Sequence, residues 1–223
     1  MIEYFFNFDD GKQLHFQVDL DRQLEPVKKP TNAPTWTKLG NNQCANCPLS
    51  PTVFSHCPAA IDLDQVISKL PKIPARTKLN ITVVTPEREY MKRVMLEEGV
   101  RALMGLIMAT SACPVLSTYR PNARHHLPFA SLEESVLRSA SLYLMKQYFI
   151  AQEGGQPDWE LRGLIKANEE LQLVNHAFWQ RTMSAFQSDA NSKALLSFFT
   201  LSSNMSASLP NQLNRMKLVF FSG

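Results

Sequence analysis

The chain has 223 residues, of which 44% are hydrophobic and 19% are charged. These proportions are close to those of ordinary globular proteins, and they exclude a chain that is disordered over most of its length. The formal net charge of +3 comes from 23 lysine and arginine residues against 20 acidic ones, an excess too small to favour a dedicated nucleic-acid-binding protein.

The N-terminal residues have neither the positive region nor the apolar core of a signal peptide. The most apolar helical segment, residues 102–116, is interrupted by polar residues and proline, and it is shorter than the ~20 residues that span a bilayer. We therefore expect a cytoplasmic protein with no membrane segment and with reduced cysteines. Residues 1–200 are expected to form a single domain, and residues 201–223 a C-terminal tail that the sequence does not assign.

Two β-hairpins are predicted in the first half of the chain. Hydrophobic and polar residues alternate over residues 2–20 on both sides of Asp10-Gly11. Asp-Gly is a strong hairpin signal because both residues tolerate a positive φ. Residues 79–84 and 89–95 show a similar pattern around a short turn. The sequence therefore predicts about four antiparallel strands.

Helices dominate the second half. The predicted helical segments are residues 61–70, 100–110, 131–151, 158–187 and 190–200. Ser131 and Glu134 have the spacing of a capping box, in which each side chain satisfies a free N–H of the first turn. Residues 111–130 are expected to be irregular. The combination predicts an α+β protein in which two hairpins pack with a helical bundle. Trp36, Trp159 and Trp179 are expected to anchor its core.

Residues 21–60 contain six prolines and show no periodic apolar run. A loop of this length inside a compact domain is usually functional, or is held by something other than regular secondary structure. Three of the four cysteines lie in it. A bound metal would explain both features, because it would fix a loop that otherwise lacks support.

The cysteines predict a metal site. Cys44 and Cys47 form a C-x2-C knuckle, Cys57 follows in the same loop, and Cys113 lies in the next irregular stretch. Four thiolates would complete a tetrahedral zinc site with Zn–S distances near ~2.3 Å. Three of the cysteines precede proline, a pattern also found at iron–sulfur ligands, so a four-thiolate iron–sulfur cluster is an alternative. Buried free thiols are the remaining interpretation.

A second candidate site is the run of Arg120, Arg124, His125 and His126. Arginine binds carboxylate or phosphate groups in a fork and histidine can transfer a proton, so the run is consistent with an enzyme or sensor that binds an anionic ligand. A solvated loop with its arginines paired to acidic residues is the competing interpretation. A Cys–His hydrolase with Cys113 as nucleophile and His125 or His126 as base is a third, and it competes with the metal site for that thiol.

Three segments carry a resemblance. They are Q-C-A-N-C-P-L at 43–49, H-C-P at 56–58 and R-P-N-A-R-H-H-L-P-F-A-S at 120–131. With their surroundings they resemble an uncharacterised bacterial family of domains of unknown function, from the first hairpin to about residue 190. The resemblance implies a bacterial, cytoplasmic protein in which the cysteine and arginine–histidine segments belong to one design. It implies no activity.

The sequence as a whole favours a metal-binding domain in which zinc ties the loop at 41–58 to the start of the segment at 113–130. Four thiolates leave no open position on the ion, so such a site is structural and not catalytic. The sequence contains no phosphate-binding loop, no G-x-G-x-x-G and no HExxH motif, and it indicates no reaction, partner or oligomeric state.

Overall fold

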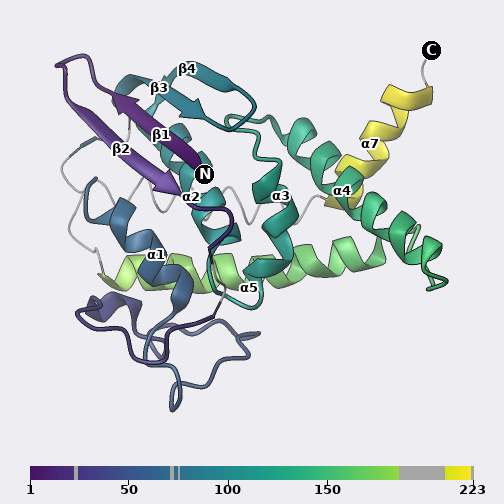
Figure 1. Cartoon of the computed structure of the whole chain (residues 1–223), viewed down its shortest axis with the longest axis horizontal. Coiled ribbons are helices and arrows are strands. Elements are labelled where there is room, and N and C mark those ends of the chain that lie inside the picture. The colour runs from purple at the N-terminus through teal and green to yellow at the C-terminus, as the bar shows by residue number, and fades with distance from the viewer. Residues whose placement is uncertain (23–24, 71–72, 75, 186–208, 222–223) are drawn as a thin grey trace.

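The structure is a computed structural model that describes residues 1–22, 25–70, 73–74, 76–185 and 209–221 (Figure 1). The strands are β1 (Ile2–Asn7), β2 (Gln13–Val18), β3 (Lys78–Val84) and β4 (Glu89–Met95). The helices are α1 (Pro58–Ile67), α2 (Leu96–Ala109), α3 (Arg120–Arg124), α4 (Leu132–Gln152), α5 (Arg162–Ala185) and α7 (Leu209–Phe221). Two 3-10 turns are η1 (Thr35–Thr37) and η2 (Leu116–Tyr119). The fold is α+β, as the sequence predicted.

The four strands form one antiparallel sheet in the order β2-β1-β3-β4. Both predicted hairpins are confirmed, and the pairing of β1 with β3 joins them. Tyr4 of β1 lies opposite Phe16 of β2 and Val83 of β3. All three side chains are buried on one face of the sheet, which carries the main apolar core. The opposite face is largely polar, as alternation along each strand requires.

Helix α2 follows β4 directly and packs against β3 and β4. The predicted helix at 100–110 is confirmed, and it begins four residues earlier, at Leu96. Gly99 faces the sheet, where a Cβ atom would lie 1.9 Å from Cδ1 of Ile81 and 3.1 Å from Cε1 of Phe6. The helix backbone can approach the sheet this closely because Gly99 has no side chain.

The predicted capping box begins α4. The Ser131 hydroxyl accepts from the Glu134 N–H at 3.1 Å, and the Glu134 carboxylate accepts from the Ser131 N–H at 2.7 Å. The next helix, α5, begins at Arg162 and not at Asp158. The Asp158 carboxylate instead accepts from the Gly163 N–H at 2.7 Å, so this residue caps the first turn from outside it.

Two local predictions need correction. Helix α1 spans residues 58–67 and not 61–70, with Pro58 in its first turn. Residues 111–130 are not irregular throughout, because η2 and α3 lie within them, again with a proline, Pro121, in the first turn of α3. Proline is favoured in the first turn of a helix, where no intrahelical partner is needed for its missing N–H. The predicted helix at 190–200 lies outside the described residues.

The unassigned C-terminal tail contains α7, which packs against α4 and α5 (Figure 1). These three helices share a second, smaller apolar cluster. Its buried members are Val136, Ala140, Leu164, Leu209 and Met216. The second half of the molecule therefore has a core of its own beside the main one.

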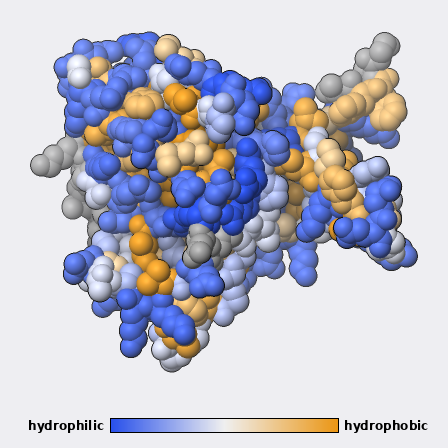
Figure 2. All heavy atoms as spheres, viewed as in Figure 1, coloured by the Kyte–Doolittle hydropathy of each residue, from blue (hydrophilic) through white to orange (hydrophobic). Residues whose placement is uncertain are grey.

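Of the three tryptophans, Trp36 is buried in the main core, but Trp159 is 55% exposed and Trp179 is 37% exposed. The prediction that these two anchor the core is wrong, because Trp159 lies in the turn before α5 and Trp179 stacks on His176 on the outer side of that helix. Figure 2 shows further hydrophobic atoms at the surface over α4 and α7. None of the described helices has the length and apolarity needed to cross a membrane.

Candidate functional site

The cysteine-bearing loop is held by its own backbone. The Cys57 N–H donates to the Thr37 carbonyl at 2.8 Å, and the Leu39 N–H donates to the Ser55 carbonyl at 2.9 Å. Lys38 and His56 form a bridge of the antiparallel kind between the same two segments. Hydrogen bonds thus clamp the two ends of the loop together, so the argument that only a metal could fix it does not hold.

Helix α5 holds the loop from the other side. Arg181 is 1% exposed, and its guanidinium donates to the carbonyls of Trp36 at 3.0 Å, Leu39 at 3.4 Å and Asn42 at 3.5 Å. One turn of the loop therefore wraps around a buried cation.

The C-x2-C knuckle has its own contact with α5. Asn46, between the two cysteines, donates from its amide to the Glu170 carbonyl at 3.1 Å and also contacts the Glu170 carboxylate. Since Glu170 lies in α5, the knuckle is fixed to the same helix as the turn that surrounds Arg181.

The four cysteines are free thiols from three local settings. The Cys47 N–H donates to the Cys44 carbonyl at 3.0 Å, which makes the knuckle a tight turn. Cys57 is the residue that precedes α1, and Cys113 follows the end of α2. Cys57 and Cys113 are buried, and Cys44 and Cys47 are partly buried.

The fold brings these four thiols into one cluster. The Cys44 thiol interacts electrostatically with those of Cys57, Cys113 and Cys47. Burial raises the pKa of Cys44 to about 12 and that of Cys57 to about 11, and the neighbouring cysteines add to both shifts. Burial likewise raises the pKa of Cys113. The cluster predicted from the sequence, including its most distant member, is thus close enough for its members to influence one another.

Backbone N–H groups near two of the sulfurs partly offset the rise in pKa that burial causes. For Cys57 the group is the N–H of Ala60, in the first turn of α1, although the Cys57 side chain makes no capping hydrogen bond to this helix. For Cys113 they are the N–H groups of Val115 and Leu116. Such donors favour the thiolate form and oppose the effect of burial. The positive charge of Arg181 acts in the same direction on Cys44 and Cys57.

The cluster is not a finished coordination sphere. In the part of the chain that the structure describes, no three His, Cys, Asp or Glu side chains are arranged to hold a metal ion. An ion bound by these thiols would therefore require side-chain rotation or a small movement of the knuckle.

The structure gives both arginines of the second candidate site a partner inside the molecule. Arg120 donates to the carbonyls of Leu20 and Arg22, each at 2.9 Å. Arg124 pairs with the exposed carboxylate of Asp21 at 2.5 Å. Both arginines thereby attach α3 to the chain that leaves β2, which favours the structural interpretation of this segment.

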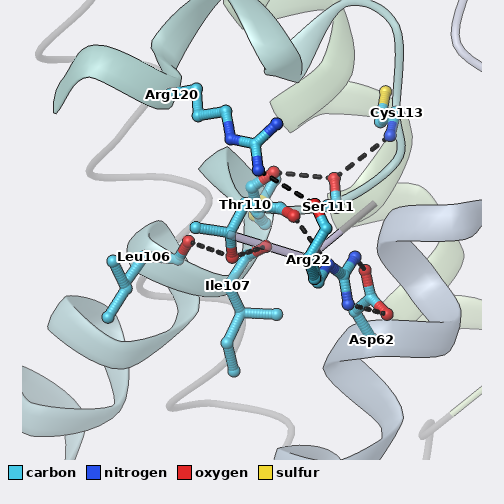
Figure 3. A network of polar contacts seen from close by, with 9 residues as sticks. Arg22, Asp62, Leu106, Ile107, Thr110, Ser111, Cys113 and Arg120 are labelled. Carbon is cyan, nitrogen blue, oxygen red and sulfur yellow. Dashed lines mark hydrogen bonds and ion pairs between the residues drawn. The ribbon is translucent and has the colours of Figure 1, made fainter. Parts of the chain in front are cut away.

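Figure 3 shows how Arg120 joins a wider network around the end of α2. Arg22 donates to the Thr110 carbonyl at 2.8 Å and forms a two-pronged ion pair with Asp62 of α1. Ser111, the next residue, accepts from the Cys113 N–H at 3.3 Å. The arginine segment and Cys113 thus belong to one polar assembly that joins α1, α2 and α3.

The two histidines differ. His125 is exposed at the end of α3, whereas His126 is partly buried and its Nε2 atom lies 2.5 Å from the Tyr4 hydroxyl. Burial, with the charge of Arg138, lowers the pKa of His126 to about 3, and burial raises that of Tyr4 well above its ordinary value. Both groups are therefore neutral at pH 7, and a hydrogen bond joins the phenol to the imidazole.

This geometry does not favour the hydrolase interpretation. A nucleophilic cysteine needs a lowered pKa, and burial raises that of Cys113. A general base should titrate near neutral pH, and His126 does not.

The sequence model of one family, described as a domain of unknown function and designated DUF6901, matches residues 2–221. The chain belongs to DUF6901. The family resemblance expected from the cysteine and arginine–histidine segments is thereby confirmed, and the match extends beyond residue 190 to include α7. Neither the comparison with curated proteins nor the comparison with solved structures found a match.

Sequence reasoning missed Arg181, the residue that connects α5 of this DUF6901 chain to the cysteine loop. The position of Arg181 in the sequence nevertheless indicates that it is buried. Val174, Phe178 and Arg181 follow one another at helical spacing along one stripe, and all three are buried. A charged residue in phase with the apolar face of a helix indicates a buried charge that must bind something.

Proposed function

We propose that this protein is a metal-binding protein in which Cys44, Cys47, Cys57 and Cys113 hold a structural zinc ion. The observation that carries the proposal is the convergence of four thiols, spread over 70 positions of the chain, into one electrostatically interacting cluster. Backbone N–H groups near the thiols of Cys57 and Cys113 lower the pKa of both and so oppose the effect of burial. Donors of this kind are what a metal-bound thiolate requires, and a buried neutral thiol has little use for them.

The local charge also suits a four-thiolate site. Zn²⁺ with four thiolates carries a net charge of about −2, which is costly to bury without compensation. The buried guanidinium of Arg181 lies close enough to Cys44, Cys47 and Cys57 to interact with them electrostatically. A cation in this position offsets part of the negative charge and favours thiolate over thiol.

The role of such an ion would be mechanical. It would join the knuckle, the start of α1 and the segment after α2, three parts of the chain that otherwise meet through α5 and the network around Arg22. With all four positions of a tetrahedral ion filled by sulfur, no position is left for substrate.

The test is metal analysis by inductively coupled plasma mass spectrometry, with an absorption spectrum, on protein purified without chelator. We expect about one zinc ion per chain and no visible absorption. Cys47→Ser should remove most of the metal and lower the melting temperature by about 4 °C or more. Ala45→Ser is the matched control, since it adds a hydroxyl at an exposed position of the same turn and should leave the metal content unchanged.

The other outcomes are equally clear. If the protein contains iron and shows a visible absorption band, the four cysteines bind an iron–sulfur cluster and not zinc. The protein would then be a redox or sensing module. Purified protein that takes up neither metal, even when reconstituted under reducing conditions, would reject the proposal and leave the four cysteines as buried thiols.

A further inference from the structure

A cavity of about 540 Å³ lies among α2, α3, α4 and α5, and no cysteine lines it. This volume is within the range of pockets that bind small organic molecules. Apolar side chains from each of these helices form most of its wall. Examples are Leu106 of α2, Ala123 of α3, Val136 of α4 and Leu171 of α5. The helices that surround it are labelled in Figure 1.

Two polar groups in this wall have unmet hydrogen-bonding capacity. Asn175 of α5 is 1% exposed, and its amide nitrogen has no hydrogen-bond partner among the described residues. The same holds for the buried Nε atom of Arg138 of α4, although Nη1 of that guanidinium contacts the His125 carbonyl at 3.3 Å. A buried donor without a partner destabilises the fold, so two of them on residues that line an apolar cavity indicate that a ligand supplies acceptors.

The charge of the wall is positive. Arg101 and Arg138 both line the cavity, and the one acidic residue that does so in the described part of the chain, Glu98, forms an ion pair with Lys92 at 2.7 Å. The other neighbours of Arg138 do not neutralise it. Tyr4 and His126 are neutral at pH 7, and the carboxylate of Glu134 accepts from the backbone N–H of Ser131.

We propose that this cavity binds a small apolar carboxylic acid, whose carboxylate lies against Arg138 and whose apolar body lies between α2 and α5. A guanidinium recognises a carboxylate through parallel N–H donors, and Nε is one of the two nitrogens of the usual fork. The apolar wall accommodates a hydrocarbon or aromatic body, and the amide of Asn175 offers a donor to a second acceptor. A phosphate dianion fits less well, because one arginine in an apolar wall leaves most of its oxygens without donors.

The test uses the full chain, with octanoate and 1-octanol as a pair of probes that differ in the carboxylate. Isothermal titration calorimetry should show that octanoate binds at least tenfold more tightly than the alcohol. Arg138→Met keeps an apolar stem and removes the donors. It should reduce octanoate affinity by roughly tenfold or more and leave octanol affinity unchanged.

A second variant tests whether the probes bind in this cavity, and it removes no side chain that makes contacts in the fold. Gly105 lies in α2, lines the cavity and is exposed, and a Cβ atom there would meet nothing within 4 Å. Gly105→Phe should keep the fold by circular dichroism, since replacing a helical glycine favours the helix. It should weaken both probes by filling the mouth of the cavity.

Each contrary result would overturn the proposal. Wild-type protein that binds neither probe at millimolar concentration has no such site. Unchanged octanoate affinity in Arg138→Met would show that the carboxylate does not lie at this arginine. Unchanged affinities in a folded Gly105→Phe variant would show that the probes bind elsewhere. The proposal does not depend on metal at the cysteines, and each of the two can fail alone.

Discussion

Two neutral side chains, Tyr4 and His126, lie near the charged side chain of Arg138. His126 is hydrogen-bonded to Tyr4 as a neutral imidazole, while Arg138 stays charged at the wall of the cavity. The charge of Arg138 is a second reason, after burial, why His126 resists protonation. A single histidine thereby couples the stability of the fold to pH.

The first prediction concerns His126. Its pKa in the folded protein, about 3, is below the ordinary value of 6.5, so the unfolded chain binds a proton in a range where the folded chain does not. Its contribution to stability is complete above pH 6.5 and is lost as the pH falls towards 3. The free energy of unfolding should therefore drop by about 2 kcal/mol between pH 8 and pH 5 through this residue alone.

Urea denaturation at the two pH values measures the effect. In His126→Gln the difference between pH 8 and pH 5 should shrink by about 2 kcal/mol. His125→Gln is the matched control, because His125 is exposed, and it should retain the difference. Equal pH dependence in both variants would show that the imidazole of His126 is not held neutral.

At the scale of elements, α2 contains two glycines in opposite settings. Gly99 packs against Ile81 and Phe6 of the sheet, whereas Gly105 has open space around it. The same substitution by alanine improves helix propensity at both positions by up to about 1 kcal/mol, so any difference between them reports packing alone.

The second prediction is that Gly99→Ala destabilises the protein, while Gly105→Ala leaves it unchanged or stabilises it. Overpacking at the sheet costs about 1–3 kcal/mol, more than the gain in propensity. The two variants should differ by about 2 kcal/mol in the free energy of unfolding, measured by urea denaturation. Variants of equal stability would mean that the sheet can yield to a methyl group at position 99.

Elements with a local signal were predictable from the sequence. The Asp-Gly turn and the alternation beside it predicted the first hairpin, and the Ser131–Glu134 spacing predicted the start of α4. The pairing of β1 with β3 depends on contacts between distant segments, and no local pattern encodes it. Trp159 shows the other limit, since an aromatic side chain can lie on the surface and its residue type alone does not decide burial.

For the candidate sites, too, the sequence predicted what local patterns encode and missed what depends on distant contacts. The sequence put Cys113 forward as a possible fourth member of the cysteine site. In the fold its thiol interacts electrostatically with that of Cys44, but no three side chains of the described residues are arranged to hold a metal ion. For Arg181 the sequence offered only its position in phase with the apolar face of α5, and for Asn175 it offered no signal. For Arg120 and Arg124 it left an anion site and pairing within the molecule as alternatives, and only the structure shows that they contact Leu20, Arg22 and Asp21.

Among the residues that the structure describes, two apolar clusters of unequal size are found. The larger one joins the sheet with α1 and α2, and the smaller one joins α4, α5 and α7. Only Val136, Ala140 and Gln147 are buried in the 21 residues of α4. Helices with few buried contacts open more readily than strands at the centre of a sheet.

The third prediction is that α7 and the second half of α4 exchange their amide hydrogens faster than β1 and β3. Hydrogen–deuterium exchange followed by mass spectrometry should show protection at least tenfold lower in these helices, since opening them gives up only the smaller cluster. Uniform protection across both parts would mean that the molecule unfolds as one cooperative unit.

Helix α5 also determines when the molecule can become complete during its synthesis. Arg181 contacts the carbonyl of Asn42, which lies 139 positions earlier in the chain. At about 5–20 residues per second, the ribosome needs about 7–28 s to add those residues. The cysteine loop is therefore synthesised well before Arg181, the cation at its centre. During this interval the thiols of Cys44 and Cys47 are expected to be accessible to metals and oxidants. Helix α5, which is synthesised after the loop, then supplies the Arg181 contacts that hold it.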